Sequence, residues 1–329
     1  MIKIKNNSSR DFLILNLTDP QLKAEEWDFD NKTGKIFKKT VETLIQRVSP
    51  DLITLSGDLS YAGDFESYKN FADYFDSFEI PWTCCFGNHD NQDGDKPVQI
   101  VIDEYMEHKY FVFEKCDLSL GNSNFVILIE KNGKSAEGVI LMDTHDRVPY
   151  KADDCGKNLA WGKLTKEQLS WYNDRVCELK EVGCDDSLLI THIPINAYLL
   201  AAKAAFKNPT PDKSVKLSDT YSPDLWNSGY ENSYGVLHEP ISAYPEDEGA
   251  FDLICRLGST KNIICGHNHI NNWVVNYKSV RFIFGTKTGN GSYWEPEING
   301  GTVIAVNENG VSSVKHEYVD VSSILGNKE

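Results

Sequence analysis

Short runs of apolar residues alternate along the chain with longer segments in which apolar residues recur every three or four positions. The short runs predict buried strands at 12–17, 52–56, 82–86, 125–129, 139–142, 188–191 and 262–265. The longer segments predict amphipathic helices at 36–48, 65–78, 166–179 and 249–257. Because strands and helices alternate over most of the length, we expect an α/β fold with helices on both faces of a sheet.

The last part of the chain follows a different pattern. Apolar runs at 272–277, 280–284, 302–306 and 311–318 are separated by turns rich in Gly and Asn, which is typical of antiparallel hairpins and predicts a second sheet. The segment 207–235 carries three prolines and scattered aromatic residues without a period. We expect a single domain over residues 1–329 with a long insertion at 207–235, which is either a functional lid or a plain surface excursion.

Composition and charge exclude several classes of protein. With 329 residues, 40% hydrophobic and 25% charged, the chain is not disordered, collagen-like or coiled-coil. A net charge of −16 argues against a nucleic-acid polymer or an anionic membrane as partner. No apolar run reaches the roughly 18 residues that cross a bilayer, and no signal-peptide pattern is found, so we expect a cytoplasmic protein. The eight cysteines form no CxxC pair and are expected to be buried thiols.

Potential metal ligands follow five of the predicted strands. The loops read Asp19-Pro20-Gln21, Gly57-Asp58, Gly87-Asn88-His89-Asp90, Thr191-His192 and Gly266-His267-Asn268-His269. Since ligands bind at the carboxyl ends of strands in open α/β sheets, these loops are expected to converge in space. Each motif alone is weak, but four of the eight histidines lie in these loops, which chance would rarely produce.

The residue types in these loops indicate one kind of chemistry. Asp, Asn and His together offer oxygen and nitrogen ligands, which suits Fe, Mn or Zn better than Mg alone or Ca. A carboxylate can bridge two ions, and two ions roughly 3.5 to 4 Å apart can hold both the attacking and the leaving oxygen of a phosphoryl transfer. We expect Gly57, Gly87 and Gly266 to let the backbone turn sharply, so that the next side chain points into the site.

The motifs GD, GNHD, THIP and GHNH, in this order, resemble those of the calcineurin-like metallophosphoesterases, which include the purple acid phosphatases. The resemblance runs from about residue 13 to at least residue 284. It implies a four-layer α/β/β/α sandwich of two mixed sheets, with a binuclear metal site at the carboxyl ends of the strands. It also implies that the chain is a metal-dependent phosphohydrolase.

At the matching positions, the resemblance implies a role for each motif residue. The implied ligands are Asp19 and His269 on one metal, Asn88, His192 and His267 on the other, and Asp58 as the bridging carboxylate. His89 matches the family's histidine that is not a ligand, and would give a proton or hydrogen bond to the phosphoryl or leaving-group oxygen. Asp90 would orient the His89 ring or raise its basicity.

The first motif departs from the commonest pattern of the family, Asp-x-His, because Gln21 stands in place of the histidine. An amide oxygen can still bind a metal and would favour Mn, Fe or Mg. Tyr61 is the alternative ligand, since residues 57–61 resemble the GDxxY motif in which purple acid phosphatases supply a tyrosinate to ferric iron. We favour Gln21, and Tyr61 would otherwise pack beneath the following helix.

Other residues are weaker candidates. His145 and His238 could reach substrate from the rim, although a surface or structural role is the simpler interpretation of both. The glycine-rich segment 286–293 could approach phosphate or be only a turn, and aromatic residues of the loops 207–235 and 145–162 could stack a nucleobase or cover the cleft. No GxSxG motif supports acyl transfer.

The predicted function is hydrolysis of phosphomonoesters, either phosphorylated small molecules or phosphoproteins. Phosphodiesters such as cyclic nucleotides are the alternative substrates, because the motifs do not separate the two groups. An alternative of another class is a catalytically silent binding scaffold with the same fold. Retention of residues for both metals and of His89 argues against the scaffold.

Overall fold

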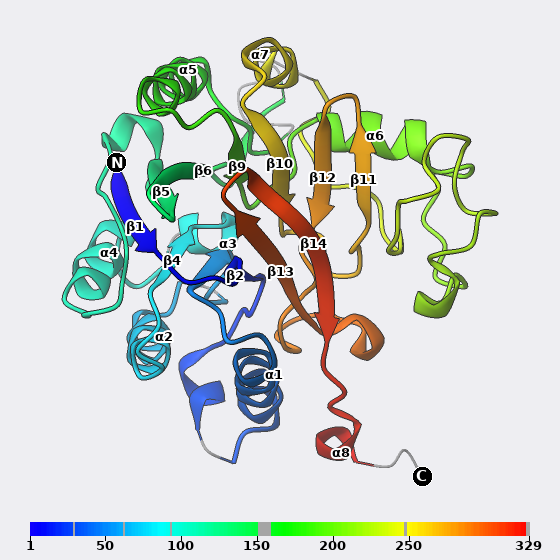
Figure 1. Ribbon diagram of the computed structural model, residues 1–329. Helices are drawn as coiled ribbons and strands as arrows, with labels where there is room; N and C mark the ends of the chain where they lie inside the picture. Colours follow the sequence, from blue (N-terminus) through cyan, green and yellow to red (C-terminus); the bar gives the residue numbers. More distant parts are fainter. Residues whose placement is uncertain (29, 62, 93, 151–158, 247–248, 327–329) are drawn as a thin grey trace.

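Two β-sheets packed face to face form the centre of the molecule, with helices on both outer sides (Figure 1). The computed structural model describes residues 1–28, 30–61, 63–92, 94–150, 159–246 and 249–326. In Figure 1, α5 and α7 lie at the top of the view and α1 and α2 at the bottom, with the sheets between them. This four-layer α/β/β/α arrangement confirms the predicted fold class.

The larger sheet has seven strands in the order β1-β5-β6-β9-β10-β12-β11. Its strands are β1 Ile2–Asn6, β5 Phe125–Lys131, β6 Lys134–Leu141, β9 Ser187–Ile190, β10 Thr260–Cys265, β11 Val274–Tyr277 and β12 Val280–Phe284. The sheet is mixed: β6, β9, β10 and β12 run parallel, whereas β5 pairs with β6 and β11 with β12 in antiparallel fashion. The carboxyl ends of β9 and β10 therefore lie at the same edge.

The smaller sheet has five strands in the order β14-β13-β2-β3-β4. Its strands are β2 Phe12–Leu17, β3 Leu52–Ser56, β4 Trp82–Cys85, β13 Gly300–Asn307 and β14 Gly310–Tyr318. Strands β2, β3 and β4 are parallel to one another, and β13 pairs antiparallel with both β2 and β14. A separate two-stranded hairpin consists of β7 Arg147–Pro149 and β8 Leu159–Trp161.

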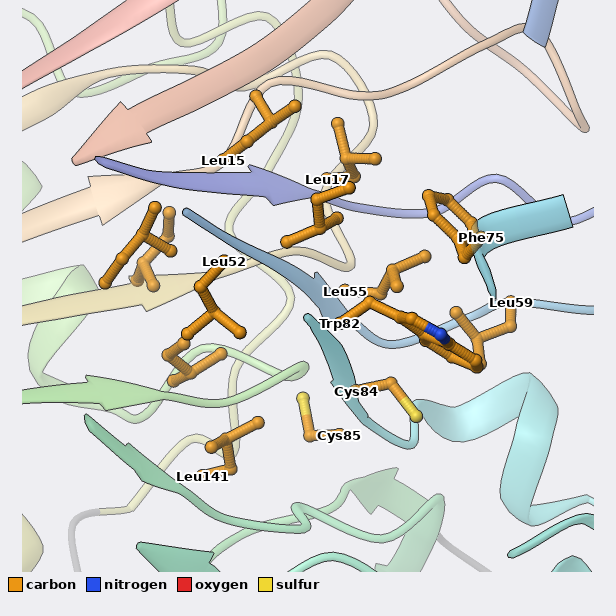
Figure 2. Close-up of a cluster of buried hydrophobic side chains, with 14 of the residues drawn as sticks. Leu15, Leu17, Leu52, Leu55, Leu59, Phe75, Trp82, Cys84, Cys85 and Leu141 are labelled. Atoms are coloured by element: carbon orange, nitrogen blue, oxygen red, sulfur yellow. The ribbon is translucent and has the colours of Figure 1, made fainter. Parts of the chain in front are cut away.

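The buried face of each sheet follows from the alternation of side chains along its strands. On β9, Leu188 and Ile190 belong to the apolar cluster between the sheets, whereas Leu189 belongs to the cluster under the outer helices. Figure 2 shows the cluster between the sheets, where Leu52 of β3 and Leu141 of β6 contribute from opposite sheets. Central strands are therefore apolar on both faces, which explains their continuous apolar runs.

The outer helices cover these sheets in two groups. The smaller sheet is covered by α1 Lys32–Val48, α2 Phe65–Asp76 and α4 Val98–Met106, and the larger one by α5 Lys166–Glu181, α6 Ala197–Ala205 and α7 Ala250–Leu257. Side chains cap the helices: Asn31 accepts from the N–H of Thr33 at the start of α1, and Thr165 accepts from the N–H of Gln168 in α5. The short helices are α3 Asn88–Asn91, α8 Ser322–Leu325, η1 Ala24–Trp27, η2 Leu118–Leu120, η3 Leu217–Asp219 and η4 Pro296–Ile298.

The predicted C-terminal hairpins are present, but the prediction that they form a second sheet of their own is wrong. The β11–β12 hairpin extends the larger sheet, and the β13–β14 hairpin extends the smaller one. Both sheets need these strands, because Ile304 of β13 lies opposite Ile14 of β2 and Ile283 of β12 lies beside Ile264 of β10, all buried. Strand β1 and helices α4 and α6 were not predicted from the apolar pattern.

The segment 207–235 contains the short helix η3 and packs on the body of the molecule. Isolated bridges join Phe206 to Trp226 and Tyr234 to Val274. Trp226 is buried, and its indole N–H donates to the Thr220 carbonyl oxygen at 3.0 Å. The single domain with an insertion here stays a prediction.

The seven cysteines in the described ranges are free thiols, as expected, but the expectation that they are buried is wrong for Cys177. Cys84, Cys85, Cys184 and Cys265 are buried, whereas Cys177 is exposed and Cys116 and Cys255 are half-buried; Cys155 lies outside the described residues. Within those same ranges, no helix has both the length and the apolar character that a membrane span requires. The cytoplasmic location stays a prediction.

Candidate metal centre

The five motif loops meet where the carboxyl ends of the central strands of both sheets come together. The loops follow β2, β3 and β4 of the smaller sheet and β9 and β10 of the larger one. Contacts between loops confirm the convergence: the His192 ring lies 2.8 Å from the Ser56 carbonyl oxygen, and the Asp19 N–H donates to the Gly57 carbonyl at 3.2 Å. Parallel strands point their carboxyl ends the same way, which brings these distant segments together.

Two groups of potential ligands share one carboxylate. Ligand atoms of Asp58, His192 and His267 all lie within 4.8 Å of one another, and the same holds for Asp19, Asp58 and His269. All five residues are buried. A carboxylate common to two such groups has the arrangement of a bridging ligand between two metal ions.

Backbone carbonyl groups orient two of the histidine rings. His192 Nδ1 lies 2.8 Å from the Ser56 oxygen, and His269 Nδ1 lies 2.9 Å from the Tyr293 oxygen. A carbonyl oxygen only accepts, so Nδ1 carries the hydrogen in both rings and each Nε2 faces a carboxylate at 3.2 Å, Asp58 for His192 and Asp19 for His269. Metal-binding histidines are commonly oriented in this way.

His267 provides the sharpest test of whether these residues suit a metal. Both of its ring nitrogens are buried, and neither has a hydrogen-bond partner. Burial, together with the charge of His192, lowers the pKa of His267 to about 3, so the ring is neutral at physiological pH. A buried imidazole without partners is costly, and a metal ion would satisfy one of its nitrogens. The residues therefore fit a metal.

Gln21 supplies a second unsatisfied acceptor. Its amide nitrogen donates to Asp58 Oδ2 at 2.8 Å, while its Oε1 atom is buried without a hydrogen-bond partner. The Asp58 contact places the Gln21 amide at the shared carboxylate. Asn88, at the start of α3, has its Oδ1 atom 3.1 Å from His192 Nε2. Each amide thus brings an oxygen to the ligand groups.

The two aspartates are ionised in spite of their burial. Burial raises the pKa of Asp58, but the charge and hydrogen bond of His192 outweigh it and lower the pKa to about 2. For Asp19, burial is likewise outweighed by His269, and its pKa lies well below the usual range. The same carboxylates outweigh burial at His192 and raise its pKa to about 10. Metal binding would release the proton of this imidazolium.

The backbone around the site is strained at four of the candidate ligands. Asp19, Gln21, Asp58 and His267 have positive φ angles of 54°, 49°, 53° and 72°. Such angles are uncommon for residues other than glycine, and they cluster at functional sites. These unfavourable backbone conformations set the directions of the four side chains.

The predicted role of the glycines is confirmed for Gly57 only. Gly57 has a φ of +90° and makes the sharp turn before Asp58. Glycine is required at positions 87 and 266 because neighbouring atoms approach closely. An added Cβ would lie 2.2 Å from Asp58 Oδ1 at Gly87 and 1.9 Å from Thr18 Oγ1 at Gly266. These two glycines make room for neighbouring loops.

His89 lies beside the shared carboxylate. Its backbone N–H donates to Asp58 Oδ1 at 2.9 Å, and its ring packs against Tyr61 with the centroids 5.0 Å apart. Tyr61 is 38% exposed and covers His89, so the expectation that it would pack beneath the following helix is wrong. The Lys23 ammonium group lies over the same tyrosine ring, 5.2 Å from its centroid.

Asp90 has partners other than the His89 ring. Its carboxylate accepts hydrogen bonds from the N–H groups of Gly87 and Leu59, at 2.7 and 3.1 Å, and from the Tyr68 hydroxyl at 2.7 Å. No hydrogen bond joins Asp90 to the His89 ring in the described part of the chain. Burial and the charge of Asp58 raise the pKa of Asp90 to about 6. Asp90 thus ties together the loops that carry Asp58 and Asn88, instead of orienting His89 as the sequence suggested.

The rings of the two weaker candidates, His145 and His238, contact other parts of the protein. His145 Nε2 lies 3.1 Å from Gln168 Oε1. His238 lies between Glu295, at 2.6 Å from Nδ1, and the Val215 carbonyl oxygen, at 2.8 Å from Nε2. The His145 contact joins a loop to α5 and the His238 contacts join loops to one another, so a structural role is favoured for both rings. Of the predicted rim loop 145–162, residues 151–158 lie outside the described residues.

Sequence reasoning missed several residues that touch the site. The Trp161 ring packs edge-on against His267 at 4.3 Å, and the Tyr293 ring stacks on His269 at 4.1 Å. The buried Lys287 donates to the Asp19 carbonyl oxygen at 2.5 Å, and burial lowers its pKa to about 8. Two segments gave a signal without naming these residues: the glycine-rich segment 286–293 contains Lys287 and Tyr293, and the loop 145–162, whose aromatic residues were expected to stack a nucleobase or cover the cleft, contains Trp161.

The fold is an α/β/β/α sandwich in which strand ends of both sheets converge and present two groups of potential ligands with a shared carboxylate. This combination is typical of binuclear metal-dependent hydrolases. A family model described as calcineurin-like phosphoesterase matches residues 12–271. The chain belongs to this family and is a metal-dependent phosphohydrolase. A comparison with curated proteins finds no match.

A solved structure with a TM-score above 0.5 shows the same fold, and two further structures have lower scores. A dimetal phosphatase from Danio rerio is 10% identical, with a TM-score of 0.57 over 94% of this chain and 99% of the other. Purple acid phosphatase PPD1 from yellow lupin (Lupinus luteus) is 12% identical, with a TM-score of 0.47 over 98% of this chain and 56% of the other. The phosphopantetheinyl hydrolase of Mycobacterium tuberculosis is 12% identical, with a TM-score of 0.41 over 85% of this chain and 92% of the other. At 10% identity, the likeness to the Danio rerio structure concerns the fold alone.

Proposed function

We propose that this chain is a phosphomonoesterase that works with two metal ions. Its substrates would be phosphorylated small molecules or phosphoproteins. One metal would be held by Asp19, Gln21 and His269, the other by Asn88, His192 and His267, with Asp58 between them.

The observation that carries the proposal is the position of Asp58 in both ligand groups. If Asp58 served only to neutralise His192, it would not need to lie in a second group with Asp19 and His269. The unpartnered nitrogens of His267 and the unpartnered oxygen of Gln21 support the same conclusion, because buried polar atoms are normally satisfied.

Two ions bound here would polarise the phosphoryl oxygens and would supply a hydroxide nucleophile near neutral pH by lowering the pKa of water. His89 is the residue of this chain that we assign to proton transfer. Its backbone is held by Asp58, and Tyr61 limits the positions of its ring. From this place it would donate a proton to the leaving-group oxygen.

We further propose that the metals are Fe, Mn or Zn. The ligand set mixes imidazole nitrogen with carboxylate and amide oxygen, a combination that these ions accept. Gln21 would add an oxygen to the site of Asp19 and His269, which favours Mn or Fe there. Tyr61 packs on His89, and for this reason we keep Gln21 as the preferred ligand.

The proposal is tested by metal analysis of the purified chain, together with hydrolysis of p-nitrophenyl phosphate and bis-p-nitrophenyl phosphate with and without added Mn²⁺. We expect about two metal ions per chain and a faster, metal-dependent turnover of the monoester. Faster turnover of the diester would replace the monoesterase by a phosphodiesterase. Absence of both metal binding and turnover would contradict the proposal and support a silent scaffold.

A further inference from the structure

Three aromatic rings surround the metal centre, and each packs on a different histidine of the site. Tyr61 lies on His89, Trp161 on His267 and Tyr293 on His269, with centroid separations of 5.0, 4.3 and 4.1 Å. The rings come from separate parts of the fold: the loop after β3, strand β8 and the loop after β12. Aromatic side chains from three parts of the fold therefore lie against the candidate metal centre.

Tyr293 packs on His269 but is more exposed to solvent than a tyrosine packed in the core. Its ring is nearly parallel to the His269 ring, at an interplanar angle of 19°, so that one face is covered. The residue nevertheless remains 49% exposed. An exposed aromatic ring gains stability when a second flat group stacks on it.

Several contacts hold Tyr293 in place. Its hydroxyl donates to Glu239 Oε2 at 2.8 Å, and its carbonyl oxygen accepts from the His269 ring at 2.9 Å. The loop before it lies tightly against the first motif, since a Cβ on Gly291 would be 2.1 Å from the Pro20 carbonyl oxygen. A ring fixed in advance loses little freedom when a ligand binds, which makes it a good stacking surface.

Glu239 adds a hydrogen-bond acceptor at the edge of this ring. Its Oε1 atom accepts from the Ile270 N–H at 2.9 Å, and its Oε2 atom accepts from Tyr293. An ionised carboxylate only accepts, and its two oxygens offer about four sites for donors. Glu239 would repel a further phosphate group but would accept hydrogen bonds from hydroxyl or amino groups.

We propose that Tyr293 and Glu239 form a nucleoside subsite, and that the substrate of this phosphohydrolase is a nucleotide. The base would stack on the open face of Tyr293, and Glu239 would accept from the sugar hydroxyls or the amino group of the base. A simple aliphatic phosphate has neither the flat ring nor this pattern of donors. This inference rests on the proposed function for its catalytic step, but the subsite itself does not require turnover.

The first test compares two monoesters in the metal-loaded enzyme, AMP and glycerol 3-phosphate, by release of phosphate. We expect Tyr293→Leu to raise the KM for AMP roughly tenfold, within the range of about 5- to 150-fold that base stacking provides, and to change the KM for glycerol 3-phosphate much less. Glu239→Gln should also raise the KM for AMP more than the KM for glycerol 3-phosphate. Tyr221→Leu is the matched control, because Tyr221 is an exposed tyrosine of the 207–235 segment that stacks on Tyr234, and this variant should leave both constants unchanged.

The second test measures binding without catalysis. Saturation-transfer NMR of the metal-free chain should show transfer to the base protons of adenosine, and the signal should be lost in Tyr293→Leu but kept in Tyr221→Leu. Equal KM values for the two esters in the unaltered enzyme would overturn the subsite. An equal rise of both KM values in Tyr293→Leu would overturn it as well. If neither ester is hydrolysed although metals bind, the proposed function fails, and adenosine binding alone then decides the subsite: binding that depends on Tyr293 supports it, and no binding overturns it.

Discussion

Two buried histidines of this protein, His267 and His238, are almost equally exposed, at 7% and 8%, yet their surroundings are opposite. Both ring nitrogens of His267 lack a partner, whereas those of His238 face Glu295 and the Val215 carbonyl oxygen. Burial therefore does not separate the candidate metal ligand His267 from the structural histidine His238. For this pair the partners of the ring nitrogens do, because a protein seldom leaves buried polar atoms unsatisfied without a function for them. The other two candidate ligands, His192 and His269, have partners for both ring nitrogens.

The largest effect should come from the shared carboxylate. We expect Asp58→Asn to reduce bound metal from about two ions per chain to fewer than one and to abolish phosphoester hydrolysis, because both ligand groups depend on it. His267→Ala should remove one ion. The control is Glu295→Gln on the His238 side, which should keep both ions. Elemental analysis checks these contents, and full metal content in Asp58→Asn would refute the bridging role.

The next effect should concern turnover without loss of metal. His89→Ala should lower kcat for a phosphomonoester by about 10² to 10⁴, the usual contribution of a general acid. Metal content should stay unchanged, because His89 contacts Asp58 through its backbone N–H. Steady-state kinetics with parallel metal analysis decide the matter, and an unchanged kcat would remove the acid role.

A smaller effect is expected at the two competing ligands of the first metal. Gln21→Ala should weaken the affinity for one ion by roughly 10- to 100-fold, since its amide contacts the shared carboxylate and its Oε1 atom is free to bind. Tyr61→Phe should leave metal affinity unchanged. Titration of the metal-free variants with Mn²⁺ measures both, and the reverse result would make Tyr61 the ligand.

On the other side of the comparison, His238→Ala should affect stability only. Loss of the contacts to Glu295 and Val215 should lower the free energy of unfolding by about 1.5 to 3 kcal/mol, the range for hydrogen bonds to charged groups. Urea denaturation measures the change. A loss of metal in His238→Ala would show that this histidine is not merely structural.

The smallest effect is a pH dependence at a third histidine. Burial lowers the pKa of His316 from 6.5 to about 4, and the ring stays neutral between Thr302 Oγ1 and the Asn272 carbonyl oxygen. Between these values the unfolded chain binds more protons, so stability should fall as the pH falls, by roughly 1 kcal/mol from pH 6.5 to 5.5. His316→Gln should show a smaller slope in urea denaturation at the two pH values, and an identical slope would contradict the assignment.

Much of the fold could be predicted because its signals are local. The apolar runs that became β2, β3, β4, β9 and β10 are buried on both faces and could hardly be anything but central strands. The C-terminal hairpins were also recognisable, but which sheet each would join was not. That choice depends on pairing between residues such as Ile304 and Ile14, which are distant in the chain.

The candidate site was predictable in its residue types and less so in its contacts. His192, His267 and His269 stood out because they follow strand ends next to other potential ligands. Asp90 lies in the same motifs and His238 was a weaker candidate, and the structure shows that Asp90 ties loops together and that His238 contacts Glu295. Side-chain direction makes the difference, and positive φ angles such as the 53° of Asp58 have no sequence signature outside glycine.

By itself, the sequence determined the alternation of strands and helices and the ligand types at the strand ends, because side-chain period and residue chemistry are properties of neighbouring positions. Only the tertiary structure decided that Asp58 belongs to both ligand groups, that His267 has no partner for its ring nitrogens, and that Tyr293 lies open on His269. These features arise from contacts between loops that are far apart in the chain, such as the one between His269 and Tyr293. Their geometry depends on how the two sheets pack against each other.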